Sequence, residues 1–202
     1  MRHTEVDEGP TTADSTAQRA RIVQAAAETI ADYGLLGASL ARIAERADAT
    51  GNLVVHHHFK NKQQLIDELV ADVQAGLGQL TAERVRQETT ARGRFLALLR
   101  AHVEFTGAHR VQMSALLAIF TNSGFPFAAA GRADALAPIE AILRDGQASG
   151  EFRAFDPRVM ASLAQCTLEG LPVLLETDPE LDLAVYAHEV TTLFDVATRR
   201  VP

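Results

Sequence analysis

The chain has 202 residues, 47% apolar but only 5% aromatic, and this aliphatic mixture favours an all-α fold because Ala and Leu propagate helices while strand-forming residues are few. Its single cysteine, Cys166, excludes an intrachain disulfide framework and a zinc site with several thiolates. No apolar run reaches the ~18–20 residues of a membrane span, and the polar first residues lack the apolar stretch of a signal peptide, so we expect a cytoplasmic protein with a net charge of −7 and no membrane partner.

The chain is expected to begin with a polar arm that leads into a helix. Residues 1–17 are rich in Thr, Ser, Asp and Glu and lack hydrophobic periodicity, so we expect them to be disordered. From Ile22 to Tyr33 apolar residues recur on one face of a helix. Gly34 follows directly and is a natural helix C-cap, so the first helix should end there.

Three more helices are predicted in the first third of the chain. Ser39 and Thr50 are suitable N-caps for two short helices, the second of which reaches about His57. A fourth helix begins near Lys62 and runs toward Arg86, with its apolar residues on one face. Short helices this close together indicate a compact helical unit.

The remaining sequence continues as helices separated by Gly and Pro. Helical stripes of apolar residues cover residues 95–106, 113–120 and 136–146. Asp156 followed by Pro157 predicts the start of the next helix, because Asp is a good N-cap and Pro is favoured at the first helical position. Pro172 should end or kink that helix, and a last helix follows Pro179. About nine helices are expected in total.

One stretch of this pattern resembles a known family. The positions that match it are Ile22, Ala25, Ala26, Gly34, Ser39, Leu40, Ile43, Ala44, Ala47, Thr50, His57, Phe59, Lys62 and Leu65. As a set they resemble the tetracycline-repressor (TetR-like) family of bacterial transcriptional regulators. Two features depart from it: Asp48 stands where the family normally has glycine, and the stretch from Ile43 to Phe59 is one residue longer than usual. The resemblance implies a helix-turn-helix DNA-binding domain over residues 18–65 and a helical ligand-binding and dimerisation domain over residues 66–202.

A DNA-binding role also has a physical basis. A short helix, a tight turn and a second short helix are what a helix-turn-helix requires. Residues 18–65 carry a charge of +2, against −3 for residues 1–17 and −6 for residues 66–202, which permits binding to DNA. Small and polar side chains reach base edges in the major groove, and Lys62 resembles the family's phosphate-contacting lysine. The expected contacts to double-stranded operator DNA are Arg19, Arg42, Thr50, Gly51, Asn52, His56, His57, His58 and Lys62.

The three adjacent histidines, residues 56–58, raise the alternative of a metal site. Adjacent side chains on a helix point about 100° apart, so three in a row cannot converge on one ion. We therefore expect no metal, and assign the histidines to contact with phosphate or to packing. The additional residue in this stretch leaves open which of the three faces DNA.

Two further sets of residues are expected in the C-terminal region. The residues predicted to line a pocket for a small hydrophobic or amphipathic effector are Phe105, His109, Met113, Leu117, Phe120, Cys166 and Glu169. The resemblance also implies that the last two helices form a homodimer, and the apolar residues predicted at that interface are Leu163, Leu171, Val190, Leu193 and Phe194. An ordinary intrachain core is the alternative for the second set.

Taken together, these features predict a ligand-responsive transcriptional repressor that acts as a homodimer on a near-palindromic operator, without a cofactor. Effector binding would favour a conformation in which the two recognition helices are wrongly spaced for DNA. One alternative is a small-molecule-binding protein of the same fold that has lost operator binding. A more distant one is a helical enzyme that uses His102, His109 and Glu169, although the sequence contains no nucleophile–base motif and no phosphate-binding loop.

Overall fold

A computed structural model describes residues 12–48, 52–122 and 129–200, and these residues form ten helices and no named strand. The helices are α1 (Thr12–Gly37), α2 (Leu40–Arg46), α3 (Asn52–His58), α4 (Lys62–Arg86), α5 (Ala91–Ala108), α6 (Arg110–Asn122), α7 (Ala129–Ala148), α8 (Pro157–Glu169), α9 (Leu171–Thr177) and α10 (Leu183–Thr198). The predicted all-α fold is therefore confirmed. The additional helix is α9, because the chain resumes helical geometry directly after Gly170.

The helices begin and end where local chemistry dictates. Ser39 and Asp156 accept hydrogen bonds from backbone N–H groups of the first turns of α2 and α8, as predicted for N-caps. Asn61 does the same for α4. Gly34 interrupts α1 with φ 69° and ψ 169°, a conformation that is essentially restricted to glycine. The predicted end of the first helix is therefore present as a break, after which the chain turns toward α2.

The predicted disordered arm is too long. α1 begins at Thr12, so residues 12–17 are helical. The sequence contains neither Gly nor Pro between Pro10 and Gly34, so nothing in it stops the helix from extending beyond the part that packs. The first eleven residues lie outside the described part of the chain.

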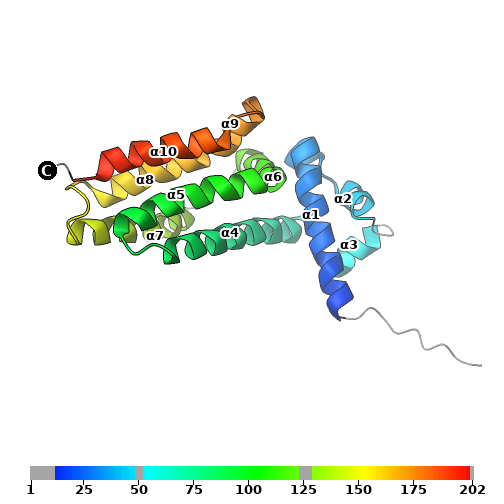
Figure 1. Ribbon diagram of the computed structural model, residues 1–202. Helices are drawn as coiled ribbons and strands as arrows, with labels where there is room; N and C mark the ends of the chain where they lie inside the picture. Colours follow the sequence, from blue (N-terminus) through cyan, green and yellow to red (C-terminus); the bar gives the residue numbers. More distant parts are fainter. Residues whose placement is uncertain (1–11, 49–51, 123–128, 201–202) are drawn as a thin grey trace, which may run out of the picture.

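The helices form an elongated bundle with a smaller unit at one end (Figure 1). α4 packs along α5, α10 lies on α5, and α7 packs against α8. α1 crosses the end of this bundle and packs extensively against α6, while α2 and α3 lie beyond it (Figure 1). Within the described residues, no helix combines the length and apolar character needed to cross a bilayer.

Two clusters of buried side chains hold this arrangement together. The N-terminal core joins α1 to α4 through residues such as Ile22, Ile43, Val55 and Leu65, and it also includes Ile119 of α6. The C-terminal core joins α5, α7, α8 and α10, and its buried members include Phe95, Leu143, Leu168 and Phe194. The N-terminal core therefore does not stop at residue 65, since one wall of it comes from the bundle.

Candidate DNA-binding surface, dimer face and effector region

The helix-turn-helix is assembled from short helices that each bury one face. α2 buries Ile43 and Ala44, and α3 buries Val55, which is followed by the fully buried Phe59. After α2 the chain turns through Asp48, whose φ of 48° lies in the left-handed region. Asp is one of the few residues other than Gly that tolerate this conformation, which explains how it can replace the usual glycine.

Several of the predicted DNA contacts lie on the outer side of this unit. His56 and His57 are exposed at the end of α3, and Arg42 is exposed on α2. The Arg42 guanidinium lies 4.7 Å from the ring centroid of Tyr33, and its Nη1 donates to the Gly37 carbonyl at 2.8 Å. Asn52 begins α3, but the structure does not describe its side chain. Thr50 and Gly51 lie outside the described residues.

Arg19 has a structural role, which argues against the predicted DNA contact. Its guanidinium forms a two-pronged ion pair with Glu68 on α4 and donates to the His58 carbonyl at 2.6 Å. It also lies 4.3 Å from the ring centroid of Phe59. These contacts fix α1 to α3 and α4 and engage Nε, Nη1 and Nη2, so a phosphate would compete with the Glu68 carboxylate for the same guanidinium group. Sequence alone could not reveal Glu68, which lies 49 residues away.

Lys62 lies at the start of α4, as predicted, but its ammonium group points back toward α1. Nζ donates a hydrogen bond to the Leu35 carbonyl. The side chain is half-buried, and this desolvation lowers the pKa of Lys62. A lysine has three N–H donors, so two remain for a phosphate while the third is bonded to Leu35, next to the break in α1 at Gly34. The phosphate contact stays a prediction.

The histidine triplet divides into two exposed residues and one constrained residue. The pKa of His58 is lowered, first by burial and then by the nearby His57 and Arg19. His57 and His58 meet edge to face, with ring centroids 5.3 Å apart. His58 is therefore less suited to a DNA contact, because it is partly buried and lies near Arg19. His56 and His57 are exposed and are better placed.

The predicted dimer residues separate into two groups. Leu171, Val190 and Phe194 are buried in the C-terminal core of a single chain, so their assignment to an interface was wrong. Leu163 and Leu193 are 56% and 61% exposed. The error has a simple cause, because α10 is apolar on two faces, and its sequence does not say which face meets α5.

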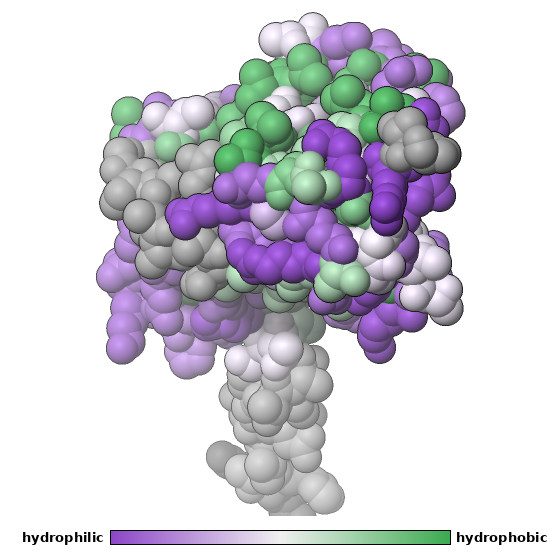
Figure 2. All heavy atoms as spheres, turned by 90° about the vertical axis from the view of Figure 1, so that its left-hand side faces the viewer, coloured by the Kyte–Doolittle hydropathy of each residue, from purple (hydrophilic) through white to green (hydrophobic). Residues whose placement is uncertain are grey.

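An exposed apolar face remains on α8 and α10. In addition to Leu163 and Leu193, it contains Val159, Val185 and Val196, each more than half exposed. On each helix these side chains are spaced at about one or two turns, and the opposite side packs on the C-terminal core. Figure 2 shows hydrophobic residues gathered at the top of the molecule, the side on which α8 and α10 lie in Figure 1. Large apolar patches of this kind mark interaction surfaces.

The predicted effector residues do not form one pocket. Phe105 is buried in the N-terminal core and stacks on His109, with ring centroids 4.1 Å apart. Met113 and Phe120 pack against that core, and Leu117 is partly buried. Cys166 is exposed on α8, next to Leu163, and Glu169 accepts a hydrogen bond from Gln165 on the same helix. The assignment of Cys166 and Glu169 to this pocket was therefore wrong.

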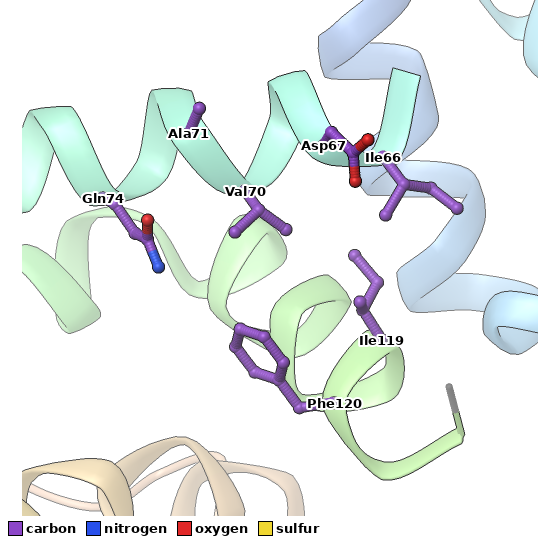
Figure 3. A pocket seen from close by; sticks show the side chains of 7 residues that line it. All are labelled: Ile66, Asp67, Val70, Ala71, Gln74, Ile119 and Phe120. Carbon is purple, nitrogen blue, oxygen red and sulfur yellow. The ribbon is translucent and has the colours of Figure 1, made fainter. Parts of the chain in front are cut away.

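A cavity nearby includes one of the predicted residues. It lies between α4 and α6, and its lining residues are Ile66, Asp67, Val70, Ala71, Gln74, Ile119 and Phe120 (Figure 3). Its volume is about 150 Å³. Only Phe120 was predicted from the sequence, because the α4 residues were assigned to an amphipathic helix and its solvated face. The sequence offered no signal for them.

The three residues considered for an enzymatic site, His102, His109 and Glu169, make separate contacts. Burial lowers the pKa of His102 to about 4, so this side chain is neutral at neutral pH. His109 Nδ1 contacts the Phe105 carbonyl at 3.0 Å. Among the described residues, no hydrogen bond joins either histidine to Glu169, and no cluster of His, Cys, Asp and Glu is suited to a metal ion.

The described part of the chain is helical and places a helix-turn-helix unit on the end of a helical bundle. Residues 22–69 match the family described as "Bacterial regulatory proteins, tetR family". The resemblance to the TetR-like family seen in the sequence is therefore confirmed. It is 29% identical over 108 residues to the HTH-type transcriptional regulator BetI of Cronobacter sakazakii, covering 52% of this chain and 53% of that protein. The match thus spans about half the length of this curated relative.

Solved structures share the fold over most of the chain. A bacterial regulatory protein in the tetR family from Rhodococcus RHA1 superimposes with a TM-score of 0.78, at 18% identity, over 92% of this chain and 98% of that one. AibR, solved in complex with isovaleryl coenzyme A and operator DNA, has a TM-score of 0.74 and is 18% identical, over 87% of this chain and 97% of that one. At these identities the likeness establishes the fold.

Proposed function

We propose that the protein is a ligand-responsive transcriptional repressor that binds a near-palindromic operator as a homodimer. The observation that carries this proposal is the α2–α3 unit, which buries its apolar faces and leaves Arg42, His56 and His57 exposed on its outer side. We assign residues 18–65 to DNA binding and residues 66–202 to effector binding and dimerisation. Lys62 then adds a phosphate contact at the start of α4.

The apolar face of α8 and α10 supports the dimer. A closed twofold dimer buries the same patch from both chains, and an exposed surface of Leu and Val side chains gains free energy on such burial. Two recognition helices related by a twofold axis would read half-sites about one helical turn apart or a little more. The dimer is therefore part of the DNA-binding mechanism.

The effector role is supported by the position of the bundle relative to the DNA-binding unit. α6 packs along α1, and Gln112 of α6 donates to Gln24 of α1 at 2.9 Å. A movement of α4 or α6 therefore changes the position of α1 and of the helices attached to it. A small molecule that binds one arrangement better shifts the population toward that arrangement and away from the operator-binding one.

Operator binding can be tested by selecting genomic DNA fragments on the purified protein and measuring affinity by fluorescence anisotropy over a range of salt concentrations. Arg42→Ala should weaken binding and reduce the salt slope by about one phosphate contact. Arg144→Ala removes an equal charge from α7 and serves as the matched control, since Arg144 pairs with Glu140 away from the DNA-binding unit. Failure to select any fragment would favour the alternative of a ligand-binding protein without an operator.

The dimer can be tested by light scattering. Leu163→Glu and Leu193→Glu should each give a monomer, because a charge would be buried without a partner at the interface. Val111→Glu is the control, since Val111 is 41% exposed on α6 and lies off this face. A wild-type protein that is monomeric at micromolar concentration would contradict the proposal.

A further inference from the structure

We propose that the cavity between α4 and α6 is the effector site, and that it binds a small protonated amine with an apolar body. This inference rests on the proposed function, since it names the ligand class and the place of regulation. Figure 3 shows the arrangement: Ile119 and Phe120 from α6 face Val70 of α4, with Asp67 toward one end and Gln74 toward the other.

The size and walls of the cavity set the apolar part of the ligand. Its volume of about 150 Å³ resembles that of a cavity that holds one benzene molecule. Aliphatic side chains of Ile66, Val70 and Ile119 and the ring of Phe120 provide most of the lining. An apolar group of one ring or a short branched chain would therefore be desolvated favourably there.

The polar groups of the cavity select the charge. Asp67 is the lining residue that carries a charge, and neither Lys nor Arg is among the lining residues that the structure describes. Asp67 Oδ1 accepts a hydrogen bond from Gln63 at 2.8 Å, while Oδ2 has no hydrogen-bond partner among the described residues. A protonated amine can donate to Oδ2, and charge-assisted bonds of this type are the stronger ones. A carboxylate ligand would be repelled by the same group.

The position of the cavity couples it to DNA binding. Ile66 and Ile119 line the cavity and are also members of the N-terminal core that holds α1, α2 and α3. A ligand seated between α4 and α6 therefore touches the side chains that position the DNA-binding unit. A shift of α4 is also passed directly to α3, because α4 begins four residues after α3 ends.

The test uses the full chain in the absence of DNA and three probes that share one ring: benzylamine, benzyl alcohol and phenylacetate. Isothermal titration calorimetry at neutral pH should show binding of benzylamine, binding of benzyl alcohol that is about tenfold weaker, and no binding of phenylacetate. Equal binding of the amine and the alcohol would overturn the assignment of charge selection to Asp67. Tighter binding of phenylacetate than of benzylamine would overturn the ligand class.

Two variants locate the site. Asp67→Asn should weaken benzylamine binding about tenfold and leave benzyl alcohol unchanged. Glu83→Gln is the matched control, because Gln79 donates to Glu83 on the same helix just as Gln63 donates to Asp67, but Glu83 lies outside the cavity. Ala71→Leu should abolish binding of both probes by filling the cavity, and Ala71 is exposed enough to accept the larger side chain without disturbing the core.

These outcomes are separable from those of the proposed function. Unchanged benzylamine affinity in Asp67→Asn or in Ala71→Leu would place the amine elsewhere and overturn the inference, whatever the protein does with DNA. Conversely, the binding pattern expected above would stand even if no DNA fragment could be selected. Where an operator is selected, benzylamine should release it from the wild type and not from Ala71→Leu, and equal release from both would overturn the regulatory part of the inference.

Discussion

Gly34→Ala offers a sharp test of how the chain passes from α1 to α2. The φ and ψ of Gly34, 69° and 169°, place it in a region that costs other residues about 1–3 kcal/mol. A Cβ added at Gly34 would meet no atom within 4 Å, so no steric term adds to this backbone cost. Alanine also restricts the unfolded chain, which offsets about 0.4–1 kcal/mol. We expect a net destabilisation of about 1–2 kcal/mol.

The same substitution at Gly78 is the control. Gly78 lies within α4, and a Cβ there would likewise meet no atom within 4 Å. Because its backbone is helical, Gly78→Ala should stabilise the protein by about 0.5–1 kcal/mol. Urea unfolding followed by far-ultraviolet circular dichroism would measure both. A Gly34→Ala variant as stable as the wild type would show that the break in α1 relaxes without strain, and would refute the reasoning.

Three other predictions concern arginine and histidine side chains. Arg19→Ala should lower the free energy of unfolding, measured in urea, by about 1–2 kcal/mol, because it removes an ion pair and a contact with an aromatic ring. The same variant should leave the salt slope of DNA binding, measured by anisotropy, unchanged. Burial holds the pKa of His102 at about 4 in the folded state, below the unfolded value of ~6.5. The free energy of unfolding should therefore be highest above pH ~6.5 and should fall by up to about 3 kcal/mol as the pH is lowered toward 4. Unfolding of His102→Leu measured against pH should lack this dependence. His56→Gln and His57→Gln should each weaken operator binding, because both side chains are exposed at the end of α3, and anisotropy affinities equal to that of the wild type would assign both residues to packing.

The sequence was most informative where a single residue type determines local geometry. The bounds predicted for α4 and the start predicted for α8 are those of the structure, because caps and prolines act on their own neighbours. Gly34 was recognised for the same reason.

Contacts between distant segments could not be predicted in this way. Arg19 has the charge of a phosphate ligand, and only the position of Glu68 shows that it braces the domain. Phe194 and Leu193 are adjacent apolar residues on one helix, yet one is 4% exposed and the other 61%. Helical periodicity shows that such a helix has apolar faces, but the partner of each face depends on tertiary packing.

The shared N-terminal core limits how this protein can be recombined with its relatives. Ala115, Leu116 and Ile119 of α6 are buried against the same residues that hold α1 to α4 together. A chimera joined near residue 65 would place those side chains against a foreign helix, leaving voids or clashes at the junction. Exchange of DNA specificity should therefore succeed when the buried α6 residues are transferred together with the first four helices. It should also succeed when only the exposed residues of α2 and α3 are replaced.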